Sequence, residues 1–342
     1  MAAAQRLLVA TDEHDINLQQ DDIMKRSILT TVSILLAACA AAQPRFETQV
    51  TTHLFGERDG KHLMLDRYTS PATEGIRPCM IFVFGGGFTS GERNAEIYIP
   101  YYEFLAGHGI DVVAIDYRLG LENIDPEKAT NIRGMISTMK NAVDMAVDDL
   151  YLATSYVLEH AEHWQIDPRR IIISGSSAGA ITVLQAENVL CNSLPAAAVL
   201  PAGFRYAGVI ACAGAIFSTD GKPHWDKAPA PIMFFHGDAD SNVPYKKASL
   251  MGIGYYGPQI ITRQLDKLGS PYYFYSAQCV DHSLAVTPLE DKLDLILQFI
   301  RDYIDQGRRL RIRTDVEKID CKGCKTRFSI RDYLSTNYAP QQ

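Results

Sequence analysis

A serine set between glycines is the residue of this 342-residue sequence best suited to nucleophilic chemistry. Ser177 stands at the centre of Gly175-Ser176-Ser177-Ala178-Gly179, after the apolar run 171–173 and before a helix-forming segment. A G-x-S-x-G pattern between a strand and a helix forces the serine backbone into a sharp turn, and small residues at its two ends avoid a collision there. We therefore predict that Ser177 is a nucleophile. Its nearest rivals are Ser174 and Ser176, and Ser176 lies one residue out of the small-residue frame.

Three consecutive glycines offer a place for developing negative charge. They follow the apolar run 80–84, about 90 residues before the serine. Glycines permit a close backbone approach, so their N–H groups can bind an oxyanion. The N–H of the residue after a nucleophilic serine usually completes such a site. We expect Gly86, Gly87 and Ala178 to form an oxyanion hole, although three glycines alone also fit a flexible turn or a phosphate site.

A serine hydroxyl needs a base to take its proton, and the base needs a carboxylate to orient it. In folds that carry the G-x-S-x-G turn, the chain order is serine, then Asp or Glu, then His. The apolar run 232–235 leads into the string 236–244, HGDADSNVP. Asp240 is the predicted acid. Asp238 is the alternative, disfavoured because it sits in the immediate turn, where Asp commonly hydrogen-bonds its own backbone.

Position along the chain leaves one of the nine histidines as the base. His282 directly follows the apolar segment 272–277 and precedes the final helical pattern. It is predicted to carry the proton, and the alternative is an exposed loop histidine. The remaining histidines lie before the acid, in edge strands, on helices or in a Pro-rich loop: His14, His53, His62, His108, His160, His163, His224 and His236.

Short apolar runs alternate with amphipathic stretches along the chain. Runs whose hydrophobicity is continuous indicate strands covered on both faces. The alternation predicts an α/β protein, with a mainly parallel sheet of about eight strands and helices on both faces, in one domain over residues 45–308. Two polar alternating segments predict an antiparallel edge near 48–55 and 61–68. The predicted buried strands are 80–84, 112–115, 171–173, 209–211, 232–235 and 272–275, and the predicted helices are 95–107, 140–162, 178–190, 258–268 and 288–306.

The candidate residues all come directly after predicted strands. In open parallel sheets, chemistry gathers at the carboxyl ends of the strands, which meet at one edge. The glycine loop, Ser177, Asp240 and His282 should therefore lie close together, although they are distant in the sequence.

Several further motifs occur in order along the chain: Phe82–Glu92 (FVFGGGFTSGE), Asp116-Tyr117-Arg118-Leu119, Asp148-Asp149-Leu150, Asp167-Pro168-x-Arg170-Ile171, the serine turn and HGxxDxxVP. Together they resemble the carboxylesterases of the α/β-hydrolase fold, in the branch of hormone-sensitive lipase and carbohydrate esterases. The resemblance covers about residues 60–300. It implies hydrolysis of carboxylic esters through an acyl-serine, with no metal ion and no cofactor.

Two other functions stay open. HGxxDxxVP also occurs in serine peptidases of the prolyl-oligopeptidase type, whose catalytic domain usually follows a β-propeller, but no repeat period of a propeller is found here. A non-catalytic binding protein on the same fold is the second alternative; such proteins generally lose a member of the triad, and this chain retains all three.

The sequence departs from the family pattern at three places. Phe84 stands where a histidine usually precedes the glycines, so we expect packing alone to hold that loop. Ser176 replaces the commoner acidic residue before the nucleophile. The segment 120–147 is unusually long and rich in methionine, and it is predicted to be either a wall of the site entrance or a plain surface helix.

The N-terminal region carries the pattern of a secretory signal peptide that starts inside the sequence. Met24-Lys25-Arg26 leads into the apolar run 28–38, which is too short to span a bilayer. Because a basic region must open such a signal, residues 1–23 are interpreted as an upstream misreading of the start. Residues 24–42 are then the signal peptide.

Two cleavage sites fit this signal. The string 36–39, ending at Cys39, resembles a bacterial lipobox, which would leave Cys39 lipidated and anchored to a membrane. Ala40-x-Ala42 suits an ordinary signal peptidase. Either cleavage predicts export to the periplasm, the outer membrane or the medium. Export and family together make an ester on a small molecule or a carbohydrate the expected substrate.

Charge and cysteine content limit the ligands that the chain is expected to bind. With 33 Lys and Arg against 40 Asp and Glu, the net charge of −7 argues against nucleic acid, which is bound mainly through basic residues. Cys321 and Cys324 form C-x-x-C in the predicted C-terminal tail, residues 309–342. A zinc site would need a second ligand pair nearby, so a local disulfide or idle thiols are expected. Six cysteines remain after the signal: Cys79, Cys191, Cys212, Cys279, Cys321 and Cys324.

Overall fold

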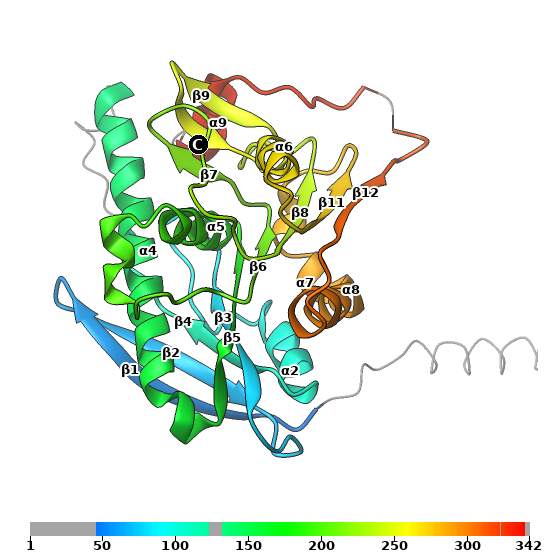
Figure 1. Ribbon diagram of the computed structural model, residues 1–342. Helices are drawn as coiled ribbons and strands as arrows, with labels where there is room; N and C mark the ends of the chain where they lie inside the picture. Colours follow the sequence, from blue (N-terminus) through cyan, green and yellow to red (C-terminus); the bar gives the residue numbers. More distant parts are fainter. Residues whose placement is uncertain (1–45, 123–131, 322, 339–342) are drawn as a thin grey trace, which may run out of the picture. The chain divides into compact units, whose positions relative to one another are not determined.

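A nine-stranded sheet runs through the part of the chain that the computed structural model describes, residues 46–122, 132–321 and 323–338 (Figure 1). The first three strands across the sheet pair antiparallel, and all later neighbours pair parallel. The order across the sheet is β1 (Gln49–Arg58), β2 (Lys61–Thr69), β4 (Asp111–Ile115), β3 (Arg77–Val83), β5 (Ile166–Ser176), β6 (Gly208–Cys212), β8 (Ile232–Gly237), β11 (Tyr272–Ala277) and β12 (Arg311–Val316).

Burial follows the hydrophobic pattern of the strands. Every residue of β3, β4, β6 and β8 is buried, as a sheet covered on both faces requires. β1 is mostly exposed and polar, and it forms the antiparallel edge. The predicted fold class, a mainly parallel sheet with an antiparallel edge, is confirmed.

The ninth strand, β12, lies in the segment 309–342 that the sequence predicted to be a tail. β12 pairs parallel with β11 and closes the far edge of the sheet. Its side chains Arg311, Arg313 and Asp315 are exposed or half-exposed, so it has no apolar run to reveal it. Charged side chains on an edge strand discourage pairing with other chains.

The helices cover both faces of the sheet. α4 packs against α5, α2 packs against α7 and α8, and Figure 1 shows the two groups on opposite faces. No helix among the described residues is long and apolar enough to cross a membrane. The helices are α2 (Ile99–Gly107), α4 (Ile132–Trp164), α5 (Ala178–Cys191), α6 (Pro258–Leu268), α7 (Pro288–Asp291), α8 (Leu293–Phe299) and α9 (Ile330–Tyr338), with single-turn elements η1 (Pro195–Val199), η2 (His282–Ala285) and η3 (Ile300–Asp305).

A second, three-stranded antiparallel sheet contacts α5 through one of its strands. It consists of β7 (Ile216–Ser218), β10 (Ile253–Tyr256) and β9 (Lys247–Leu250), and β9 is in contact with α9. These strands of three or four residues were not predicted, because such short segments show no clear hydrophobic period.

Some sequence predictions lie outside the described residues. These are the misread start at 1–23, the signal peptide at 24–42 with its Cys39 lipobox, and the part of segment 120–147 between 123 and 131.

Candidate active site

The turn that carries Ser177 is strained and tightly enclosed. Ser177 follows β5 and has φ 51° and ψ −114°, a backbone region that residues other than glycine seldom adopt. A Cβ on Gly175 would lie 2.4 Å from the backbone of Gly179, and one on Gly179 would lie 1.9 Å from the carbonyl oxygen of Val83. Only glycines let β3 and the turn approach so closely. The rival Ser174 and Ser176 are buried.

The structure brings the three predicted triad residues together. Ser177 Oγ lies 2.8 Å from His282 Nε2, and His282 Nδ1 lies 2.7 Å from Asp240 Oδ2. His282 begins η2 directly after β11, and Asp240 follows β8, so adjacent parallel strands deliver both side chains to one edge of the sheet. The arrangement is a nucleophile, a base and an orienting carboxylate in hydrogen-bonded sequence.

Asp240 is fully buried and stays ionised. Burial by itself would raise its pKa, but hydrogen bonds from His236 and His282 outweigh burial and hold the pKa of this carboxyl well below its usual range. Its second oxygen accepts from the N–H groups of Asn242 and Val243, at 2.8 and 2.9 Å. Every bond to Asp240 favours the charged form that a protonated histidine needs beside it.

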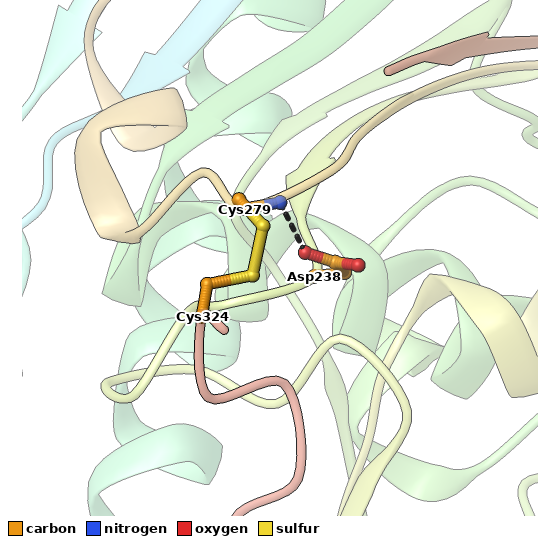
Figure 2. Close-up of a disulfide and its surroundings, with 3 residues drawn as sticks. All are labelled: Asp238, Cys279 and Cys324. Carbon is orange, nitrogen blue, oxygen red and sulfur yellow. Dashed lines mark hydrogen bonds between the residues drawn. A yellow bond between two sulfur atoms is a disulfide. The ribbon is translucent and has the colours of Figure 1, made fainter. Parts of the chain in front are cut away.

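Asp238, the alternative acid, has a different task. Its carboxylate accepts from the N–H of Cys279 at 2.6 Å and fastens the loop that leads from β11 to His282 (Figure 2). The geometry therefore favours Asp240 as the acid.

His236 belongs to the site in a way that sequence reasoning missed. Its side chain is fully buried, with Nε2 at 3.3 Å from Asp240 Oδ2 and 3.0 Å from the carbonyl oxygen of Val243. Chain order excludes it as the base because it precedes the acid, but chain order does not exclude a supporting role. Its position beside the predicted acid was the available signal.

The predicted oxyanion donors divide into two groups. Gly87 and Ala178 line the same cavity as Ser177, and Ala178 opens α5, where N–H groups have no partner within the helix. Gly86 is not among the lining residues. It has φ 130°, and a Cβ there would lie 1.9 Å from the carbonyl oxygen of Ser90. Gly86 thus shapes the loop, while Gly87 and Ala178 line the cavity together with Ser177.

Two tyrosines hold the glycine loop, which corrects the prediction that packing alone would do so. The hydroxyl of Tyr98 accepts from the N–H of Gly85, and the hydroxyl of Tyr117 donates to the carbonyl oxygen of Phe84, each at 3.1 Å. Hydroxyls from residues 13 and 33 positions further along the chain therefore hold the loop in which Phe84 stands in place of a histidine.

The site opens into a small apolar cavity of about 130 Å³. Met135, Ile136 and Met139 in the first turns of α4 contribute one wall, so this part of segment 120–147 lines the site entrance, in agreement with one of the two predictions. Polar groups enter mainly from the loop after Asp240 and from α9. The lining includes Thr89, Met135, Ile136, Met139, Ile181, Phe217, Asn242, Val243, Tyr333 and Asn337.

The disulfide differs from the predicted local one. Cys279 pairs with Cys324, 45 residues away (Figure 2). Cys321 keeps its thiol. The three sulfur atoms lie within 4.8 Å of one another. With two of them in a disulfide, this cluster offers a single thiol, which is not a zinc ligand set. C-x-x-C spacing suggested a pair within the motif, because the fold that brings Cys279 there cannot be read from spacing.

Comparisons with known proteins agree with this fold. The model of the BD-FAE family matches residues 65–187, which include the glycine loop and Ser177. Among solved structures, the apo form of Thermogutta terrifontis esterase 2 superimposes with a TM-score of 0.53 and 21% identity, over 77% of this chain and 96% of that one. Its propionate-bound form gives a TM-score of 0.52, also at 21% identity, over 76% and 95%. The chain has the α/β-hydrolase fold.

Esterases are among the sequence relatives. Juvenile hormone esterase of Heliothis virescens is 28% identical over 176 residues, 51% of this chain and 26% of that protein. Esterase B1 of Culex pipiens is 32% identical over 108 residues, 31% of this chain and 18% of that protein. The resemblance to α/β-hydrolase carboxylesterases is confirmed. The chain spans about a fifth to a quarter of the length of these curated relatives.

Proposed function

We propose that the protein is a serine esterase that hydrolyses carboxylic esters through an acyl-serine intermediate. The observation that carries this proposal is the bonded series Ser177, His282 and Asp240, with contacts of 2.8 and 2.7 Å and with Ser177 lining an apolar cavity. Esterases among its sequence relatives support the same activity.

The geometry supports a two-stage reaction. His282 Nε2 takes the proton of Ser177 as Oγ attacks the ester carbonyl, and the N–H groups of Gly87 and Ala178 stabilise the oxyanion. His282 then gives the proton to the leaving alkoxide, which departs as an alcohol and leaves the acyl group on Ser177. In the second stage water attacks the acyl carbon, His282 takes the water proton, and the same proton returns to Ser177 as the acid leaves. Asp240 stabilises the charged imidazole throughout.

The proposed substrate is an ester with an apolar acyl group, carried by a small molecule or a carbohydrate. The methionines and isoleucines around the cavity suit such an acyl group. The carbohydrate part of the proposal rests on the resemblance in the sequence and on export.

Export is part of the proposal. The signal-peptide pattern at 24–42 predicts it, with release after Ala42 or a lipid anchor at Cys39. The Cys279–Cys324 disulfide supports it, because disulfides persist mainly in oxidising compartments outside the cytosol.

Labelling with a fluorophosphonate probe, together with hydrolysis of p-nitrophenyl acetate, tests the function. We expect wild type to be labelled and to turn over the ester, and Ser177→Ala to do neither. Labelling that survives Ser177→Ala would reject the nucleophile. If wild type is not labelled and does not turn over the ester, a non-catalytic binding protein is favoured. If it cleaves peptide amides in preference to esters, a peptidase is favoured.

The acid is tested by paired variants. Asp240→Asn should reduce kcat by several orders of magnitude, as loss of the triad carboxylate does elsewhere. Asp238→Asn is the matched control and should reduce kcat much less. The reverse result would exchange the two assignments.

A further inference from the structure

We infer that residues 323–338, here called the C-terminal strap, form the specificity-determining wall of the acyl cavity, with Tyr333 limiting the acyl chain and the Cys279–Cys324 disulfide holding the strap in place. The inference rests on the proposed esterase function and adds to it which part of the chain selects the substrate.

The strap reaches the site from the far edge of the sheet. After β12 the chain leaves the sheet, and it returns as α9 beside β9 (Figure 1). Tyr333 and Asn337 of α9 then line the cavity that contains Ser177. The first turns of α4 line it as well, through Met135 and Met139. A wall made by a separate C-terminal segment can change without disturbing the sheet.

Tyr333 is the largest side chain that the strap contributes to the cavity. It is only 8% exposed, and its hydroxyl lies 3.4 Å from the carbonyl oxygen of Asp240, to which it donates. Its ring packs against Phe328 of the strap, with 5.6 Å between the ring centroids. A buried aromatic ring of this size sets a firm boundary for an acyl chain.

A second contact joins α9 to the loop that follows β8 and carries Asp240 and Asn242, here called the acid loop. The side-chain amide of Asn337 donates to the carbonyl oxygen of Asn242 at 3.0 Å. The strap therefore bonds to backbone oxygens of the acid loop, and among the described residues it makes no hydrogen bond to the side chain of Ser177 or His282. This separates selection of the acyl group from the chemistry.

The disulfide fixes the other end of the strap to the loop between β11 and His282, here called the base loop. Cys324 is bonded to Cys279, three residues before His282, and the N–H of Cys279 is bonded to Asp238 (Figure 2). The strap thus joins the loop of the base to the loop of the acid.

Such a tether is needed because α9 is weak by itself. It has nine residues, and isolated helices of that length are marginal in water. Its first turn is closed by Ser329 and Asp332, whose side chains each accept from the other's N–H, and by the ion pair of Lys325 with Asp332. A covalent link raises the effective concentration of the strap at its docking site.

The first experiment measures kcat/KM of the full mature chain for p-nitrophenyl esters from acetate to octanoate. Tyr333→Ala should raise the octanoate-to-acetate ratio about 10-fold or more, since a few methylenes in a pocket change selection by that order. Tyr333→Phe keeps the ring and should keep the ratio of wild type. An unchanged ratio in Tyr333→Ala, or the same shift in Tyr333→Phe, would overturn Tyr333 as the limit.

The second experiment tests the disulfide and does not depend on how Tyr333→Ala folds. Cys321 lies close enough to pair with Cys279 if Cys324 alone is replaced, so Cys321→Ser is combined with Cys324→Ser. This double variant should shift the ratio in the same direction as Tyr333→Ala. Cys321→Ser alone keeps the disulfide and should behave as wild type. A double variant with the ratio of wild type would overturn the role of the disulfide.

Fluorophosphonate labelling of every variant separates the two proposals. If wild type is neither labelled nor active on acetate, the esterase proposal fails. If wild type is active and the labelled variants keep its acyl profile, the esterase proposal stands and the strap inference fails.

Discussion

Gly179 shows how much the nucleophile depends on a residue that takes no part in the reaction. The strained backbone of Ser177 persists because the turn is pressed against the end of β3, where a Cβ on Gly179 would lie 1.9 Å from the carbonyl oxygen of Val83. Strain of this kind costs about 1–3 kcal/mol and survives only when the surrounding structure enforces it.

Gly179→Ala should therefore be severe. The new methyl group would collide with the carbonyl oxygen of Val83, and we expect a loss of about 3 kcal/mol or more in the free energy of unfolding, with loss of ester turnover. Gly203→Ala is a suitable control. Gly203 has φ 80° but nothing within 4 Å of an added Cβ, so its substitution should cost only about 1–2 kcal/mol, as the dihedral alone requires. Urea unfolding measures both, and equal losses would contradict the collision.

Asp240 should make the free energy of unfolding depend on pH in the acidic range. A carboxyl whose pKa falls on folding stabilises the folded state fully above its unfolded pKa of about 3.9, and this contribution is lost as the pH drops below that value. The pKa of Asp240 is lowered on folding, despite its burial, by His236 and His282. Urea unfolding measures the free energy of unfolding of wild type and of Asp240→Asn. The difference between the two should be about 1 kcal/mol smaller at pH 3 than at pH 7. A gap that does not change with pH would contradict this.

His236 should act as a positioning residue through Asp240. His236→Phe removes the Nε2 contact and should lower kcat/KM about 10-fold or more, since a hydrogen bond to a charged group is worth roughly 1.5–3 kcal/mol. It should also make the acid-induced loss of stability smaller, because the pKa of Asp240 in the folded state would rise toward its unfolded value. His236→Gln can restore an N–H and should recover part of both effects. Normal pH dependence in His236→Phe would leave His236 a purely structural role.

At the scale of elements, predictability followed the strength of the hydrophobic pattern. β3, β4, β6, β8 and β11 carry continuous apolar runs, and the sequence placed all of them. The triad followed from these strands, because their carboxyl ends meet at one edge. The sequence did not predict the three short strands β7, β9 and β10 or the helix α9, which contribute to the walls of the cavity. The described side chains of α9 are mostly exposed. Such segments are fixed by tertiary contacts and leave little periodic signal.

The α4 wall should oppose the strap in selecting the acyl chain. Met139 lines the cavity from α4, and a methionine there can adapt its shape to different acyl groups. Met139→Trp should fill that space and lower the octanoate-to-acetate ratio about 10-fold, the opposite of Tyr333→Ala. The neighbouring Lys140, which is exposed and paired with Asp144, provides the control, and Lys140→Ala should keep the ratio of wild type. A rise of the ratio in Met139→Trp would place the acyl chain elsewhere.

At the scale of the whole molecule, β12 extends the folded domain beyond its predicted boundary. The sequence predicted a domain that closes at residue 308, yet β12 covers the edge of β11, and the Arg313 guanidinium lies 4.9 Å from the centre of the Phe274 ring. Without β12, the strand with Phe274 would become the edge. An exposed apolar edge strand pairs readily with other chains.

Two truncations test this boundary, each with Cys279→Ser to remove the unpaired thiol. The chain ending at residue 316 keeps β12 and lacks the strap; we expect it to stay monodisperse in size-exclusion chromatography and to hydrolyse longer acyl esters relatively better than the full chain does. The chain ending at residue 308 exposes β11 and should aggregate. Equal solubility and equal thermal stability of the two truncations would mean that β12 is dispensable and that the sheet is complete at β11.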